Sequence, residues 1–255
     1  MENNELELIK NSLPKLYQNL KEHNFLQGEV FNEIFIEEVQ ALKTYLTQLK
    51  KQFDDFDNFS PTRQEKIDYI NNHKYEIFNK LNTFFVRIWN FVEKLSSQEY
   101  RIYQLYIQKE LYRLLGLTPF NRYIYEKPLG YPGDYIMMNY LYEDGYVGTT
   151  TFEKLIHRYT CSTPMARANI NRKDYFKRHI KEILISSDGN AKIASIACGP
   201  AREAIEIISE EEKALNSTFT FFDFEPRALK FIDEEIKKIE GRRVNVVFIN
   251  ENITS

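Results

Sequence analysis

Apolar residues recur every three or four positions through the first half of the chain, which is the spacing of amphipathic helices. Three such series are present: Leu6, Ile9, Leu13, Leu16 and Leu20; Phe31, Phe35, Val39, Leu42, Leu46, Leu49, Phe53 and Phe56; and Ile67, Ile70, Ile77, Leu81, Phe84, Ile88, Phe91 and Leu95. Ser96 followed by Glu99 indicates a capping box that opens a fourth helix, and Gly116 is expected to close it. We therefore predict a helical domain over residues 1–118. Its aromatic residues would form either a ligand pocket or plain core, and their helical spacing favours core.

The helical pattern is lost between Pro119 and Pro132. The run Lys127-Pro128-Leu129-Gly130-Tyr131-Pro132-Gly133-Asp134 contains two prolines and two glycines, which predicts a loop. A short helix is expected to follow to about Tyr142. Thr163 and Pro164 are typical of an N-cap and a first helical position, so a further helix is predicted towards Ser186. Residues 119–190 are interpreted as a connecting segment that covers a ligand site.

After residue 190, short β-rich runs alternate with helical ones. The predicted order is a buried strand over 192–197, a helix over 200–215, a strand over 219–223, a helix over 226–239 and a strand over 244–249. Such alternation implies right-handed crossovers and a parallel sheet. The predicted fold class is α/β: an N-terminal helical bundle followed by a partial Rossmann-like parallel sheet over residues 191–255.

Composition narrows the partners to small molecules. The chain has 255 residues, 43% of them hydrophobic, and a formal net charge of -3, so it has no basic field for nucleic acid. Cys161 and Cys198 have no metal-ligand or redox spacing, which fits a reducing cytoplasm and indicates no metal site. No segment resembles a secretory signal or a membrane span.

The first predicted strand runs into Ala197-Cys198-Gly199-Pro200-Ala201-Arg202-Glu203. Ligands of open parallel sheets bind at the carboxyl ends of the strands, where small residues let the backbone approach and the next helix points its N–H groups at the ligand. A dinucleotide site requires three glycines and only one is present, which disfavours NAD; the lysine-bearing P-loop signature is absent as well.

An acid follows the second strand about twenty residues later, where it can accept both hydroxyls of a ribose. Asp223 lies directly at this strand end and is preferred for that role, although it would also suit an ordinary helix-start acid. Glu225 is interpreted as a solvated acid at the start of the next helix. After the third strand, the Asn252 amide is predicted to contact an adenine edge while Ile253 packs on the adenine face.

These two strand-end motifs, Ile196-Ala197-Cys198-Gly199-Pro200-Ala201-Arg202-Glu203 and Asp223-Phe224-Glu225-Pro226-Arg227-Ala228-Leu229, resemble motif I and the acidic loop of class I S-adenosylmethionine (SAM) dependent methyltransferases. The run 127–134, Thr163-Pro164-Met165-Ala166-Arg167 and Asn171-Arg172 resemble bacterial methyltransferases labelled as extracellular-factor 3-hydroxypalmitic acid methyl ester biosynthesis proteins. The resemblance covers about residues 120–253.

The resemblance implies SAM as the cofactor, with the methionine part held by Gly199 and its neighbours Ala197, Cys198, Pro200, Ala201 and Glu203. It implies ribose binding by Asp223, with Phe224 beside it, and Asn252 stands where the family more often has Asp. Two departures are Ser195, where an acid is usual, and Ala197, where glycine is usual; alanine still permits close approach of a ligand.

The loop Gly130-Tyr131-Pro132-Gly133-Asp134 is expected to close over the sulfonium end of SAM, with Tyr131 and Asp134 within hydrogen-bonding distance. A rigid interdomain turn is the alternative. Arg167 and Arg172 lie about 140° apart around one predicted helix, so only one of them, here assigned as Arg167, would clamp a carboxylate. No catalytic base is identified, and a carboxylate nucleophile attacking a sulfonium methyl needs none.

Class I methyltransferase sheets have seven strands, whereas this chain reaches Ser255 just past the third. The first strand would then present an unpaired edge, which a companion chain or self-association would complete. The leading hypothesis is a SAM-dependent methyltransferase acting on a small-molecule or acyl carboxylate or hydroxyl, with weak turnover by this chain alone. The alternatives are an enzyme that uses the aminocarboxypropyl group of SAM and a non-catalytic SAM-binding module.

Overall fold

The computed structural model describes residues 32–116, 118–143, 145–239, 241 and 244–252. The predicted helix over Leu6–Leu20 lies outside these residues. The described chain divides into two compact units. The first, here called the helical unit, contains the described residues up to Pro128 and Tyr146–Tyr159; the second, the sheet unit, contains Leu129–Gly145 and the described residues from Thr160 onwards. The segment 119–190 is thus divided between the two units.

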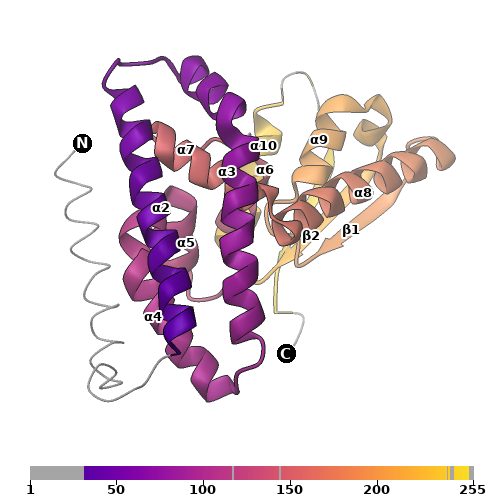
Figure 1. Cartoon of the computed structure of the whole chain (residues 1–255). Helices are drawn as coiled ribbons and strands as arrows, with labels where there is room; N and C mark the ends of the chain where they lie inside the picture. The colour runs from indigo at the N-terminus through magenta and orange to yellow at the C-terminus, as the bar shows by residue number, and fades with distance from the viewer. Residues whose placement is uncertain (1–31, 117, 144, 240, 242–243, 253–255) are drawn as a thin grey trace. The chain divides into compact units, whose positions relative to one another are not determined.

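The helical unit is built on three long helices that lie side by side, with α2 contacting both α3 and α4 (Figure 1). Its helices are α2 (Glu33–Asp57), α3 (Arg63–Val92), α4 (Ser97–Leu115), α5 (Pro119–Glu126) and α7 (Thr151–Ser162), the last belonging to this unit up to Tyr159. Six of the predicted apolar positions on α2 are buried, namely Phe35, Val39, Leu42, Leu46, Leu49 and Phe53, and Phe56 near the end of the helix is half-buried. The helical periodicity is therefore confirmed where the structure describes it.

The predicted capping box at the start of α4 is present. The Ser96 Oγ accepts a hydrogen bond from the Glu99 N–H at 3.4 Å, and the Glu99 carboxylate accepts one from the Ser96 N–H at 2.9 Å. Thr62 and Glu65 form a second capping box at the start of α3. These reciprocal bonds satisfy backbone donors that a helix start otherwise leaves unpaired.

Two helices of this unit were not expected from the sequence pattern. The prediction of no helix between Pro119 and Pro132 is wrong, because α5 begins at Pro119 and ends at Glu126. It has only two turns and buries only Phe120, which is too little for a visible period. Helix α7 has no visible period for a different reason. It is buried on almost every side, so it lacks the alternation of apolar and polar faces that marks an amphipathic helix.

The sheet unit contains three parallel strands in the order β1-β2-β3, which confirms the predicted parallel alternation. Its elements are α6 (Tyr135–Tyr142), α8 (Pro164–Ser186), β1 (Lys192–Ile196), α9 (Arg202–Glu210), the 3₁₀ helix η1 (Glu212–Asn216), β2 (Thr218–Asp223), α10 (Pro226–Lys237) and β3 (Asn245–Asn250). In the register of the sheet, Phe219 on β2 pairs with Ile193 on β1 and with Val246 on β3. The parallel register places the ends of all three strands at one edge.

Helix α9 is shorter than predicted, because residues 200 and 201 remain in the loop and Glu210 ends the helix before η1. One face of the sheet is covered: Phe219 and Phe221 are buried in a core that also contains Ile207 and Ile208 from α9 and Ile232 from α10.

The prediction of a buried first strand is wrong, because β1 alternates between exposed and half-buried residues. Ile196 is 60% exposed and Val247 on β3 is 44% exposed, so the second sheet face is accessible in the described part of the protein. Among the described strands, only β2 pairs with β1. No described helix has the length and apolar character needed to cross a membrane.

Candidate functional site

The chain leaves β1 through a tight loop in which three residues have left-handed backbone conformations. The φ angle is 51° at Ala197, 52° at Gly199 and 44° at Ala201. The Cys198 N–H continues the sheet ladder by donating to the carbonyl of Phe222 at 3.1 Å. Left-handed residues alternating with ordinary ones turn backbone N–H groups into a concavity that suits an anion. Gly199 adopts this conformation without strain, whereas the Cβ atoms of Ala197 and Ala201 make it unfavourable, so the loop holds two alanines in a strained turn.

Gly199 is the point of this loop at which a ligand can approach the backbone. No atom outside its chain neighbours lies within 4 Å of the position that a side chain would occupy there. Pro200 and Ala201 are buried, whereas Gly199 is half-exposed. The sequence predicted that the backbone of this motif passes close beneath a ligand, and the structure leaves open space for such a ligand at Gly199.

Asp223 joins the ends of β1 and β2. Its side chain is buried, and its Oδ2 accepts the Gly199 N–H at 2.8 Å while its Oδ1 accepts the Glu225 N–H at 3.0 Å. The Cys198 Sγ lies 3.8 Å from the same Oδ2. A carboxylate has about four acceptor positions. The three contacts leave one position on Oδ1 for a ligand hydroxyl, while a second hydroxyl on Oδ2 would replace the weak thiol bond.

The Cys198 thiol is a hydrogen-bond donor rather than a nucleophile. Burial, together with the negative charge of Asp223, raises the pKa of Cys198 to about 12. The thiol is therefore protonated at neutral pH and is unreactive, since the thiolate is the nucleophilic form.

Glu225 is not the solvated acid that the sequence suggested. Its side chain is 7% exposed and accepts hydrogen bonds from the Arg227 N–H at 3.0 Å and from the Arg227 guanidinium at 2.6 and 2.7 Å. These bonds hold the pKa of Glu225 below its usual range. Sequence spacing alone does not show that Glu225 is buried or that it pairs with Arg227.

Two aromatic rings lie beside the end of β2. The ring centroids of Tyr131 and Phe224 are 5.0 Å apart at an interplanar angle of 55°, and Phe224 is 52% exposed. Burial raises the pKa of Tyr131 to about 12, with smaller contributions from the charges of Glu225, Asp223 and Asp134. The structure therefore brings the predicted loop residue Tyr131 to the strand-end acids, as a neutral hydroxyl that can donate.

Asp134 has a structural contact that the sequence analysis did not assign. Its buried carboxylate caps α6 by accepting the N–H groups of Ile136 and Met137, each at 2.9 Å. Gly133 precedes it with a φ of 80° and open space beside its Cα. Asp134 thus fixes the exit of the loop at the start of α6.

Glu203 forms a second polar cluster at the start of α9. Burial raises the pKa of Glu203, while hydrogen bonding to its own backbone N–H and the nearby Arg172 and Lys173 oppose the shift. Burial raises the pKa of the Tyr142 hydroxyl, and the nearby Arg172 opposes that shift. Arg167, in contrast, is exposed near the start of α8, and no described contact connects it to Asp223 or Gly199. Of the two arginines, the structure places Arg172 near Glu203.

The end of β3 contributes an amide, though not at the predicted position. The Asn250 Nδ2 donates to the Asp223 carbonyl at 2.9 Å and thereby fixes the strand end that carries the acid. Asn252 lies two residues further on and is exposed, and Ile253 lies outside the described residues. The register pair of Asp223 and Asn250 would have indicated this bond had the strand end been predicted one residue later.

Arg202, for which the sequence predicts no role, connects three helices of the sheet unit. Its Nε donates to Asn139 Oδ1 at 2.7 Å, its NH1 nitrogen lies 3.1 Å from Glu235, and its guanidinium lies 4.8 Å from the Phe231 ring centroid. These contacts connect α9 to α6 and α10. Arg202 therefore holds the helices that carry the strand-end loops.

The strand-end arrangement combines a carboxylate that can accept ligand hydroxyl groups with a loop whose backbone a ligand can approach at Gly199. Within the described part of the chain, no three His, Cys, Asp or Glu side chains are grouped to bind a metal ion. Neither a protein-family model, nor a curated protein, nor a solved structure matches the chain.

Proposed function

We propose that the sheet unit binds SAM and that the protein is a methyltransferase of the class I type acting on a carboxylate or hydroxyl of a small or acyl molecule. The observation that carries this proposal is the bond from the Gly199 N–H to the buried Asp223 carboxylate at the ends of two parallel strands. A ligand can approach the backbone at Gly199 and meet the charged acceptor Asp223 beside it, at the edge where ligands of parallel sheets bind.

Asp223 takes the ribose in this proposal. The free acceptor position on Oδ1 would receive one ribose hydroxyl, and the other hydroxyl would compete with the Cys198 thiol for Oδ2. The thiol is the weaker donor, so its displacement costs little. These acceptor positions on Asp223 favour a ligand with two hydroxyl groups. A phosphate is disfavoured, because the carboxylate would repel its negative charge.

Gly199 takes the methionine part in this proposal, because the start of α9 follows directly and the positive end of the helix dipole favours the methionine carboxylate. The acid that class I enzymes commonly have at position 195 is replaced by serine. Glu203, one turn into α9, is the carboxylate that would bind the methionine ammonium in its place. A bound ammonium would lower the raised pKa of Glu203, which gives this assignment a measurable signature.

Tyr131 and Phe224 form the apolar wall of the proposed site. A sulfonium supplies an activated methyl group, so the work of the protein is to align an oxygen nucleophile with it and to exclude water. The Tyr131 hydroxyl, protonated at neutral pH, can donate to the acceptor molecule without competing as a nucleophile.

Product analysis tests the reaction. The full chain is incubated with SAM and 3-hydroxypalmitic acid, the acid named in the label of the resembling proteins, and the nucleoside products are identified by mass spectrometry. S-adenosylhomocysteine together with a methyl ester is the expected result. Methylthioadenosine would instead show use of the aminocarboxypropyl group, and binding without any product would show a non-catalytic module.

A further inference from the structure

A second candidate ligand site lies entirely within the helical unit. A cavity of about 580 Å³ lies between α4 and α5 and is lined by Gln104, Ile107, Gln108, Leu111, Tyr112, Leu115, Gly116, Asn121, Ile124, Tyr125 and Lys127. This volume is within the range of small-molecule sites, which combine apolar walls with a few polar groups. None of the strand-end residues takes part in it.

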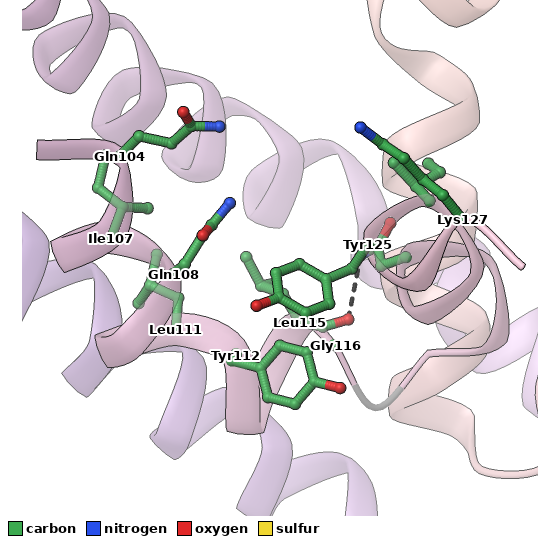
Figure 2. A pocket seen from close by; sticks show the side chains of 11 residues that line it. Gln104, Ile107, Gln108, Leu111, Tyr112, Leu115, Gly116, Tyr125 and Lys127 are labelled. Carbon is green, nitrogen blue, oxygen red and sulfur yellow. Dashed lines mark hydrogen bonds between the residues drawn. The ribbon is translucent and has the colours of Figure 1, made fainter. Parts of the chain in front are cut away.

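The polar groups of the cavity converge on one space. Figure 2 shows the amides of Gln104 and Gln108, both on α4, extending towards the space that the Lys127 side chain enters from the end of α5. In the described part of the chain, no hydrogen bond or ion pair engages any of these three side chains. Lys127 is the one cation of the lining, which contains no acid. A ligand with a single negative charge fits this set of donors.

Two tyrosine rings form the wall beside these donors. The ring centroids of Tyr112 and Tyr125 are 5.0 Å apart at an interplanar angle of 56° (Figure 2). Such tilted pairs present both ring edges and ring faces, which favour a further aromatic ring over a flexible chain. Ile107 and Leu111 line the cavity as well, so the body of the ligand is apolar.

The wall depends on a glycine. A Cβ on Gly116 would lie 2.7 Å from two ring atoms of Tyr112, so only glycine leaves this ring where it stands. Lys127 itself has a φ of 45° as the C-cap of α5, a conformation that glycine and asparagine adopt more readily than lysine. The chain therefore has a lysine at a position where glycine or asparagine would adopt the left-handed backbone with less strain.

We propose that this cavity binds a small aromatic carboxylic acid, with its carboxylate on Lys127 and the glutamine amides and its ring against Tyr112 and Tyr125. The donor set supplies the selectivity for an anion, and the tyrosine pair supplies the selectivity for a ring. The site does not depend on the strand-end function.

Calorimetry on the full chain with three probes tests both parts of the proposal. The probes are 2-naphthoate, its uncharged analogue 2-naphthamide, and octanoate, which has the carboxylate without the ring. We expect 2-naphthoate to bind about fivefold or more tightly than either of the other two, as one partly exposed ion pair or one ring contact allows. Equal affinity for naphthoate and naphthamide would refute the anion site, and equal affinity for naphthoate and octanoate would refute the ring site.

Variants locate the probe in the cavity. Lys127→Asn keeps a residue that tolerates the left-handed conformation and removes the charge, so 2-naphthoate is expected to bind about fivefold more weakly while 2-naphthamide is unaffected. Lys109→Gln, at an exposed α4 position outside the lining, is the matched control and is expected to leave both affinities unchanged. Gly116→Ala is expected to weaken both probes by displacing the Tyr112 ring. Binding of 2-naphthoate that Lys127→Asn leaves unchanged would overturn the proposal.

Discussion

The two units hold their acidic side chains in different ways. In the helical unit, Asp57 bonds to groups distant in the chain, namely the Thr151 N–H at 2.8 Å and the Lys66 ammonium at 3.1 Å. In the sheet unit, Asp134 and Asp223 accept backbone N–H groups of the loops at the helix starts and strand ends. The first arrangement joins whole helices, and the second fixes loop geometry. Substitutions in the helical core should therefore change global stability, whereas those at the sheet acids should also change ligand binding.

The largest expected effect is on the helical core. Phe35 is 1% exposed, and its ring centroid lies 4.6 Å from that of Tyr103. Phe35→Ala should lower the free energy of unfolding by about 3–5 kcal/mol, because it leaves a cavity among the three long helices. Phe59→Ala, at a residue that is 84% exposed, is the matched control and should change it by less than about 0.5 kcal/mol. Urea denaturation followed by circular dichroism measures both; equal effects would contradict the assigned core.

Asp223→Ala should have the next largest effect, and here stability and binding change together. Loss of the carboxylate leaves the Gly199 and Glu225 N–H groups without their acceptor, at a cost of about 1–3 kcal/mol. Binding of S-adenosylhomocysteine should weaken at least as strongly. Asp174→Ala, on α8 with a side chain 64% exposed, should change neither quantity appreciably. A stable Asp223→Ala variant with full affinity would contradict both roles of the carboxylate.

The contrast between the units also explains which features the sequence could predict. The α2 core and the Ser96–Glu99 capping box follow from spacing within one element, and both are confirmed. Helix α7 was missed because burial on almost every side removes the period, and the expectation of a solvated Glu225 was wrong because its burial and its pairing with Arg227 cannot be derived from spacing. The aromatic residues of the predicted helical domain, Tyr112 among them, were expected to form core rather than the wall of a ligand pocket. Spacing places an aromatic residue on a helix face, but only the packing of α5 decides whether that face is filled.

Valine substitutions at Gly199 and Gly241 separate backbone strain from ligand binding. Gly199 and Gly241 both have left-handed φ angles, 52° and 70°, and both have open space at the Cβ position. Valine at either position should cost about 1–2 kcal/mol of stability through backbone strain. Only Gly199→Val should also abolish S-adenosylhomocysteine binding, because its side chain would occupy the space of the ligand. If thermal denaturation shows equal strain and calorimetry shows equal affinity, the ligand does not approach Gly199.

The smallest expected effect is the contribution of Glu203 to the pH dependence of stability. Burial raises its pKa in the folded protein above the usual carboxyl range, so the folded state binds this proton more tightly than the unfolded state. The contribution of this group to stability is therefore greatest at pH values below its unfolded pKa and declines as the pH rises through the folded pKa. Glu203→Gln should flatten this part of the stability profile. If S-adenosylhomocysteine binds as proposed, it should return the pKa of Glu203 towards its usual value, which carbon-detected NMR of a labelled side chain can follow.

Isothermal titration calorimetry with S-adenosylhomocysteine shows whether the ends of β1 and β2 form the proposed SAM site. We predict one site per chain in the parent protein. The site should be lost in Gly199→Val, weakened by Asp223→Ala and retained in Gly241→Val. Absence of any binding heat at millimolar ligand across a range of temperatures, or equal affinity in all four proteins, would contradict the account.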